Sequence, residues 1–270
     1  MVLEGEKVGD GMKRLLALIG GEEFSDGFED VHADLLARMD GRPGRVVYLP
    51  TCASDDGEET VDHWCDLARR RLSDLGAQVD TPRVVDRDSA NNPEYARLVA
   101  EAGWIYLGGG YPHVAMRILP GTRVLEALYT ALKRGVLLTG ASGGAMLMCA
   151  RSFVVTPEFS EEASRIWESG APPDWDPPMP PLFDCLGIVP NTFCAPHFNR
   201  LFATKWLEHG LLPPGHSLIG IDEQTALISN DDTAGEAATD WQVAGRGMVT
   251  LYRGDQLAGR YPSGNTISMW

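Results

Sequence analysis

The sequence lacks long hydrophobic runs, paired cysteines and an excess of positive charge, and each absence excludes a class of protein. Hydrophobic residues make up 44% of the 270-residue chain, yet no apolar run approaches the ~20 residues needed to span a bilayer. The formal net charge is -15, and an acidic surface repels both nucleic-acid phosphates and anionic lipids. We therefore expect neither nucleic acid nor a membrane to be a partner.

Cysteine usage points to a reducing compartment. The number of cysteines is odd and no two are spaced as Cys-x-x-Cys, and a chain of this length does not need disulfides to stabilise its core. The first apolar run, Leu15–Ile19, is too short for a signal-peptide core, so we expect a cytoplasmic protein whose first buried strand is this run. Nothing in the spacing supports a zinc site, and no motif implies a metal or an organic cofactor.

Short apolar runs alternate with amphipathic stretches along most of the chain. The predicted strands are Leu15–Ile19, Val46–Leu49, Gln78–Val79 with Arg83–Val85, Trp104–Leu107, Val136–Thr139 and Ser217–Ile221. The predicted helices are Gly27–Met39, Thr60–Leu75, Leu125–Leu132 and Gly144–Ala150. This alternation predicts one α/β domain over residues 1–270, with a mainly parallel sheet covered by helices on both faces.

Two regions depart from this alternation. Near the C-terminus, three short apolar runs separated by glycines predict an antiparallel meander at the sheet edge: Trp241–Val243, Met248–Tyr252 and Gln256–Leu257. Residues 157–181 are too rich in proline for a helix or a central strand, and we interpret them as a surface excursion that forms a lid or a subunit contact. Together with the apolar tail Ile267–Trp270, this excursion suggests a homodimer.

A serine stands at the apex of a predicted strand–turn–helix. The strand Val136–Thr139 runs into Gly140-Ala141-Ser142-Gly143-Gly144, a Gly-x-Ser-x-Gly pattern typical of an elbow that holds a nucleophilic hydroxyl above the sheet edge. The amide of Gly143 would lie at a helix N-terminus, where it can stabilise an oxyanion. The alternative is that Ser142 only caps the helix.

Three glycines follow the predicted strand Trp104–Leu107. Successive glycines let backbone amides approach a ligand closely. A phosphate-binding loop is one alternative, but the chain has neither the Lys-Ser/Thr of a P-loop nor Gly-x-Gly-x-x-Gly at this point. Because the ends of parallel strands converge on one crevice, we expect the amide of Gly109 or Gly110 to be a second oxyanion donor. The other interpretation is a plain turn.

An activated serine needs a general base, and the chain has six histidines. His197 follows an apolar run and a proline, just past a predicted strand end, and His113 could line the same crevice. The other four lie in contexts that look solvated: His32, His63, His209 and His216. Asp222 and Glu223 offer an orienting carboxylate between two apolar runs, but they point to opposite faces of an extended segment. The residues leave open which of the two faces His197, or whether both lie on an exposed turn.

Taken in order, these segments resemble the dipeptidase E and cyanophycinase family of serine peptidases. The resemblance covers most of residues 14–255 through LALIGGEEF, RVVYLPTCAS, YLGGGYP, GASGGAM, CAPHF and GIDEQTALI. It implies a class-I-glutamine-amidotransferase-like fold with serine in place of the amidotransferase cysteine. It also implies that Ser142 is the nucleophile, His197 the base and Glu223 the third member of a triad that hydrolyses small peptides or isopeptides.

The sequence departs from the family pattern in two places. The elbow carries Gly143 where relatives commonly have alanine, which predicts a less rigid turn. Relatives that cleave next to aspartyl residues carry several arginines after the histidine, whereas residues 198–206 contain only Arg200 and Lys205 as cations. The shortage argues against aspartyl specificity.

The substrate is expected to be a small peptide, and four residues beside the predicted triad are expected to bind it: Tyr111, His113, Asn199 and Arg200. An amidase or esterase on the same fold, or a non-catalytic binding protein, are the alternatives, because a fold alone does not fix a function. An intact triad argues against the binding protein.

Overall fold

The structure is a computed structural model that describes residues 15–39, 44–154, 180–200, 207, 210–230 and 240–269. Nearly all of the predicted excursion, residues 157–179, lies outside the described residues, as do His209, Lys205 and Trp270. Among the described residues, no helix has both the length and the apolar character needed to cross a membrane.

Five of the eight strands of the central sheet are parallel and adjacent, in the spatial order β1-β5-β4-β2-β3. Their bounds are β1 Leu15–Ile19, β2 Arg45–Leu49, β3 Gln78–Asp80, β4 Trp104–Leu107 and β5 Leu137–Ala141. Strands β1, β4 and β5 are buried along their whole length, as expected when helices cover both faces of a parallel sheet. The predicted mainly parallel sheet is confirmed.

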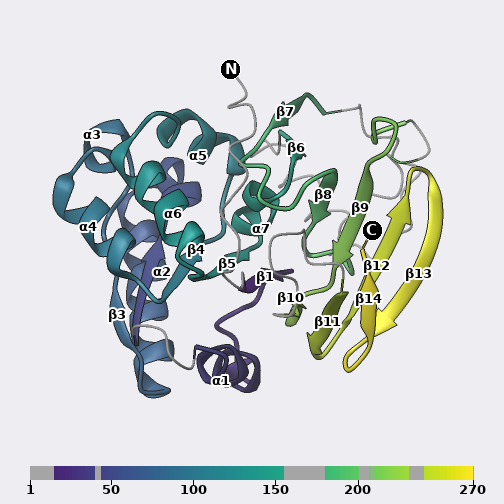
Figure 1. The fold of residues 1–270 in the computed structure, drawn as a ribbon, viewed down its shortest axis with the longest axis horizontal. Helices are drawn as coiled ribbons and strands as arrows, with labels where there is room; N and C mark the ends of the chain where they lie inside the picture. Colours follow the sequence, from purple (N-terminus) through teal and green to yellow (C-terminus); the bar gives the residue numbers. More distant parts are fainter. Residues whose placement is uncertain are drawn as a thin grey trace.

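Helices pack on both faces of this sheet (Figure 1). One face packs against α1 (Glu29–Ala37) and α2 (Glu58–Asp74). The opposite face packs against α3 Arg87–Ala90, α4 Pro93–Glu101, α5 Pro112–Ile118, α6 Arg123–Lys133 and α7 Gly143–Met148. A short 3-10 helix, η1 (Thr51–Asp56), follows β2 and contacts α5. Alternate residues of each strand therefore face two separate apolar clusters.

A second sheet, which the sequence did not predict, has the order β13-β12-β9-β8 and lies at the opposite end of the molecule from α2–α4 (Figure 1). Its strands are β8 Thr192–Ala195, β9 Ser217–Ile221, β12 Met248–Arg253 and β13 Gln256–Pro262. Strands β8 and β9 pair in parallel and the others are antiparallel. A two-stranded pair joins β6 (Arg151–Phe153) to β7 (Leu182–Asp184).

The C-terminal region is antiparallel, as predicted, but it is divided between the two sheets. Strands β10 (Thr225–Ser229), β11 (Asp240–Gly245) and β14 (Thr266–Ser268) extend the central sheet beyond β1. Strands β12 and β13 instead pair with β9. The chain crosses between the sheets at the β9–β10 turn, and this crossing brings the second sheet against the end of β1.

Two local predictions are wrong, and the burial of the tail is explained within the chain. Residues 83–85 form no strand, although Val84 is buried. His32 is not solvated but buried, with its Nε2 atom 3.3 Å from the Tyr106 hydroxyl, and burial lowers its pKa to about 3. Ile267 and Met269 are buried in the core of their own chain, so their burial needs no partner subunit.

Candidate active site

Ser142 occupies a strained turn between β5 and α7. Its backbone has φ 49° and ψ -117°, a conformation that residues other than glycine seldom adopt and that is common at functional sites. A Cβ atom on Gly140 would overlap the backbone of Gly144, and a Cβ atom on Gly144 would overlap the carbonyl oxygen of Leu107. Both glycines of the Gly-x-Ser-x-Gly pattern are therefore needed for the turn to form.

The Ser142 side chain makes no capping hydrogen bond to helix α7. Its Oγ atom instead lies 3.0 Å from Nε2 of His197, which follows β8 and has φ 49° itself. The other ring nitrogen of His197, Nδ1, lies 2.9 Å from Oε1 of Glu223 in the β9–β10 turn. Serine, imidazole and carboxylate thus form one continuous chain of hydrogen bonds.

Glu223, and not Asp222, faces His197. The Oδ2 atom of Asp222 accepts a hydrogen bond of 3.1 Å from the amide of Met248, and its carboxylate also accepts from the backbone of Asn199. Asp222 therefore ties the β9–β10 turn to the start of β12. The two neighbouring acids point to different partners, as their alternation in an extended segment requires.

The end of β1 joins all three segments of this site. The carbonyl of Ile19 accepts from the amide of Ser142 (2.9 Å), that of Gly20 accepts from His197 (2.7 Å), and that of Gly21 accepts from Gln224 (2.9 Å). Gly21 has φ 129°, and a Cβ atom there would overlap the imidazole of His197. A role of the Gly20–Gly21 pair in the site was not predicted from the sequence. The pair follows β1, the strand beside β5, and neighbouring parallel strands end at the same edge of a sheet. This position was the signal in the sequence that the pair lies near Ser142.

Two residues that are expected to bind substrate, Asn199 and Arg200, both contact Glu223. Nε of Arg200 lies 2.9 Å from Oε2 of Glu223, and Oδ1 of Asn199 accepts a hydrogen bond of 3.0 Å from the Glu223 amide. The hydrogen bond from His197 lowers the pKa of Glu223 most, and the charge of Arg200 lowers it further, while burial opposes both. These contacts hold a negative charge beside the imidazole.

The three glycines expected to bind an oxyanion meet at the elbow. A Cβ atom on Gly109 would lie 3.3 Å from the Ser142 Cβ, and one on Gly143 would overlap the carbonyl oxygen of Gly110. Among the described residues, no backbone hydrogen bond uses the amides of Gly109, Gly110 or Gly143. The sequence predicted that Gly143 loosens the turn. The structure gives it a different role, because glycine lets the elbow touch the Gly108–Gly110 loop.

Tyr111 and His113 lie at the start of α5, which packs against α7. Their rings are 5.7 Å apart, and the ring of His113 also meets Phe183 of β7 at 6.3 Å. Burial lowers the pKa of His113, and the nearby charge of Arg117 lowers it further. The ring of His113 therefore lies between Tyr111, which follows the glycine loop, and the β6–β7 pair.

All five cysteines are free thiols. Burial raises the pKa of Cys52 to about 12 and that of Cys65 to about 11, and it also raises that of Cys185. The pKa of Cys194 is raised by its hydrogen bond with Cys149 and by burial. A thiol with a raised pKa is a poor nucleophile at neutral pH. Ser142, with its imidazole partner, is the better candidate.

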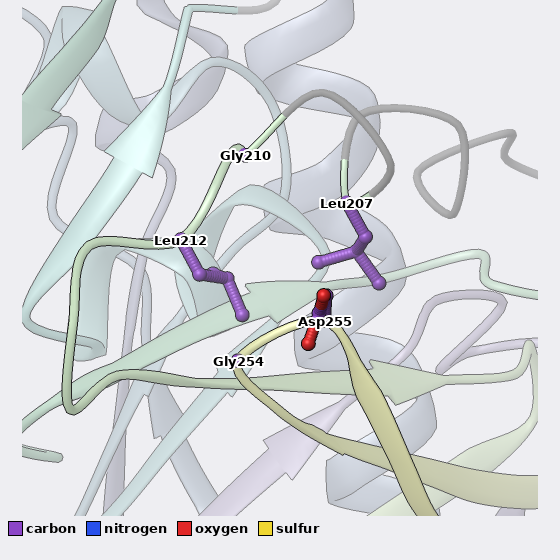
Figure 2. A pocket seen from close by; sticks show the side chains of 5 residues that line it. All are labelled: Leu207, Gly210, Leu212, Gly254 and Asp255. Carbon is purple, nitrogen blue, oxygen red and sulfur yellow. The ribbon is translucent and has the colours of Figure 1, made fainter.

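A pocket of about 260 Å³ lies at the β12–β13 turn, away from these residues (Figure 2). Its lining residues are Leu207, Gly210, Leu212, Gly254 and Asp255. None of the three hydrogen-bonded residues of the Ser142 site lines it, so it contributes nothing to the chemistry at the elbow.

Comparison with known proteins places the chain among peptidases. The sequence model of peptidase family S51 matches residues 15–237. The chain is 28% identical to a peptidase from an acI-B1 actinobacterium, with a TM-score of 0.76 over 96% of this chain and 98% of that one.

A second solved structure shares the fold. It is a protein described as a candidate peptidase E from Listeria monocytogenes EGD-e, 16% identical, with a TM-score of 0.54 over 82% of this chain and 96% of that one. At this identity the likeness shows the fold alone. No curated protein matches the chain.

Proposed function

Because this chain belongs to peptidase family S51 and is therefore a serine-type peptidase, we propose that it hydrolyses small peptides or isopeptides through an acyl-enzyme on Ser142. One observation carries the proposal: the hydrogen bonds from Ser142 to His197 (3.0 Å) and from His197 to Glu223 (2.9 Å). A serine becomes a nucleophile when a neighbouring base takes its proton and a third group orients that base.

In the proposed mechanism, Nε2 of His197 accepts the Ser142 proton while Oγ attacks the substrate carbonyl. Nδ1–H of His197 donates to Glu223, whose carboxylate fixes the tautomer and stabilises the imidazolium that forms. In this mechanism the amides of Gly109 and Gly143 donate hydrogen bonds to the developing oxyanion, with Gly110 beside them. His197 then protonates the leaving amine, and the same imidazole activates the water that releases the acyl group.

We propose short peptides with no requirement for an aspartyl residue. Arg200 is engaged with Glu223, which supports a role in holding the triad rather than in binding a substrate carboxylate. Tyr111 and His113 remain candidates for contact with the substrate, because α5 starts where the glycine loop ends. An amidase or esterase would use the same nucleophile. Hydrolysis of simple amides or esters, with no hydrolysis of peptides, would distinguish these activities from a peptidase.

The free thiols support action in a reducing compartment, and we propose the cytoplasm. The homodimer stays a prediction that now depends on the excursion alone, since the described tail residues are buried within the chain.

Labelling with a fluorophosphonate, followed by intact-mass measurement, tests the nucleophile. The native chain should gain one adduct, Ser142→Ala should gain none, and Ser73→Ala, which removes an exposed serine at the end of α2, should label like the native chain. Ser142→Ala should also lower kcat for dipeptide hydrolysis by about 10⁴-fold or more. Labelling that persists in Ser142→Ala, or a native chain that neither labels nor hydrolyses any member of a dipeptide library, would overturn the proposal.

A further inference from the structure

The triad acid stands where the backbone leaves the pairing of the strands. Glu223 lies between β9, which ends at Ile221, and β10, which begins at Thr225, and the next residue, Gln224, has φ 53°. Among the described residues, no backbone hydrogen bond uses the amide or the carbonyl of Glu223. Strand pairing therefore does not fix the main chain that carries this carboxylate.

The side chains of Asn199 and Thr225 bind these two backbone groups. Oδ1 of Asn199 accepts a hydrogen bond of 3.0 Å from the Glu223 amide. The Thr225 hydroxyl donates to the Glu223 carbonyl (3.1 Å), and its oxygen accepts from the amide of Gly247 (2.9 Å). The main chain of the triad acid is thus held on both sides by side chains that do not belong to the triad.

Both side chains belong to segments that are bound to the end of β1. The carbonyl of Gly20 accepts from the amide of His197 (2.7 Å), and Asn199 follows His197 by two residues. The amide of the same glycine donates to the carbonyl of Thr225 (3.0 Å). The two side chains therefore fix Glu223 relative to the strand end at which the base is also attached.

The two residues differ in how much their loss should cost the fold. Asn199 is exposed, whereas Thr225 is fully buried. Water can replace the Asn199 oxygen at the Glu223 amide with little loss of stability. Water does not hold that amide at a fixed distance from the segment of the base, however. A loss of activity without a matching loss of stability is therefore the mark of a positioning role for Asn199.

We propose that Asn199 and Thr225 are positioning residues, which together clamp the main chain of Glu223 and keep its carboxylate within hydrogen-bonding distance of His197. The proposal rests on the serine-peptidase function proposed above and adds two residues to it. It gives Asn199 a role in place of the substrate contact that the sequence predicts. The clamp acts on kcat and not on KM, because the carboxylate orients the imidazole and stabilises the imidazolium that forms during the reaction.

Asn199→Ala tests the exposed half of the clamp, with Asn92→Ala as its matched control. Asn92 makes the same kind of bond at the start of α4, where its Oδ1 atom accepts from the amide of Glu94 (2.9 Å). Asn199→Ala should lower kcat for dipeptide hydrolysis by about tenfold or more, because small displacements of catalytic groups are costly. KM should stay within about twofold of the native value. Asn92→Ala should leave both constants unchanged.

Asn199→Asp separates the acceptor oxygen from the rest of the side chain. It keeps an oxygen that can accept from the Glu223 amide and loses the NH2 group, so it should recover part of the kcat that Asn199→Ala loses. A substrate contact made by the NH2 group would not be recovered, and its loss would raise KM. Native kcat with a raised KM in Asn199→Ala, or no recovery in Asn199→Asp, would overturn the proposal.

Thr225→Val and Thr225→Ser test the buried half of the clamp. Valine has the shape of threonine without the hydroxyl, so Thr225→Val should lower kcat by about tenfold or more, whereas Thr225→Ser keeps the donor and should keep most of the activity. Thr122→Val is the matched control, because Thr122 is fully buried and its hydroxyl donates to the carbonyl of Leu119 (2.7 Å). Both valine variants should melt at a lower temperature, but only Thr225→Val should lose kcat.

Fluorophosphonate labelling of Ser142 separates failure of the clamp from failure of the peptidase function. Activity is expressed per labelled site, so that a loss of folded chain does not count as a loss of kcat. A native chain that neither labels nor hydrolyses any peptide refutes the serine-peptidase function. If it labels without hydrolysing dipeptides, the rate constants of labelling are compared in place of kcat. Native rates per labelled site in both Asn199→Ala and Thr225→Val refute the clamp alone.

Discussion

The nucleophile side and the base side of the site are held in place by different forces. The nucleophile side, the Ser142 elbow with the Gly108–Gly110 loop, consists of backbone segments in close contact, where added Cβ atoms would overlap the carbonyl oxygens of Leu107 and Gly110. The base side, His197 with Asn199, Arg200 and Glu223, is held by polar side chains. The Arg200 and His197 side chains are 47% and 32% exposed.

This difference shows how one site combines rigidity with adjustment. Backbone-to-backbone packing leaves no soft degree of freedom, so the nucleophile and the candidate oxyanion amides keep a fixed relation to each other. The imidazole is placed by hydrogen bonds from separate segments, and its ring can rotate if a neighbour changes. Substitutions on the two sides should therefore differ in the size and in the kind of their effects.

The largest effect is expected from Gly144→Ala on the nucleophile side. The new Cβ atom overlaps the carbonyl oxygen of Leu107 in β4, and a central strand cannot move aside, so α7 and Ser142 must shift. We expect kcat/KM and the rate of fluorophosphonate labelling to fall by about 10³-fold, because displacements of about 1 Å already cost 100-fold. The melting temperature should fall as well.

Gly76→Ala is the matched control for this variant. Gly76, unlike Gly144, has positive φ (91°), but no atom lies within 4 Å of an added Cβ, so only backbone strain of about 1 kcal/mol is expected. Labelling should then proceed at the native rate. Native labelling of Gly144→Ala itself would show that close backbone packing does not fix the nucleophile side.

A smaller loss is expected from Gly21→Ala on the base side. Here the added Cβ atom overlaps the His197 ring, which can rotate away and break its hydrogen bond to Ser142 while β1 stays in place. We expect kcat to fall by about 100-fold with little change in KM and a smaller drop in melting temperature than for Gly144→Ala. Steady-state kinetics and thermal unfolding check this. Equal losses of activity and of stability in Gly21→Ala and Gly144→Ala would show that the two sides of the site are not held by different forces.

The smallest effect is expected from Arg200→Met, which removes the half-exposed ion pair to Glu223. An exposed pair contributes little, so kcat/KM should fall only about two- to fivefold at neutral pH. The pKa of Glu223 is lowered in the native structure, so its carboxylate persists as the pH falls below the ordinary value of 4.5 and is lost at the folded pKa.

Without Arg200 the pKa of Glu223 rises, and the acid limb of the pH profile of kcat/KM should move to higher pH. Arg200→Lys should recover part of the shift, because it keeps the charge without the guanidinium geometry. A profile that does not move while KM rises would show that Arg200 binds substrate, as predicted from the sequence.

The nucleophile side could be predicted from the sequence because its determinants are local. Strand, glycines, serine and helix follow one another within residues 137–148, and each glycine is required by a neighbour in the fold. The base side could be predicted only in part. The choice between Asp222 and Glu223 depended on family resemblance, and the contacts that Asn199 and Arg200 make with Glu223 were not predicted.

The burial of His32 and Glu23 could not be predicted at all. Both are polar residues in stretches whose pattern fits a solvent-facing position. His32 packs against Trp104 and Tyr106 of β4, and Phe24, the residue after Glu23, packs against Tyr48 of β2, all of them distant in the sequence. The second sheet escaped prediction for a related reason. In sequence, its short strands resemble those of the central sheet. Only the strands with which they form hydrogen bonds assign them to a different sheet.

The sequence by itself determined the α/β alternation, the Gly-x-Ser-x-Gly elbow and the glycine loop, because strand periodicity and the steric needs of tight turns act between residues close in the chain. Only the tertiary structure decided that the carbonyls of residues 19–21 would join the segments of Ser142, His197 and Glu223. It also decided which carboxylate faces the imidazole and that Glu23 lies buried. These outcomes depend on how two sheets dock at one strand end, and docking is set by contacts between residues far apart in the chain.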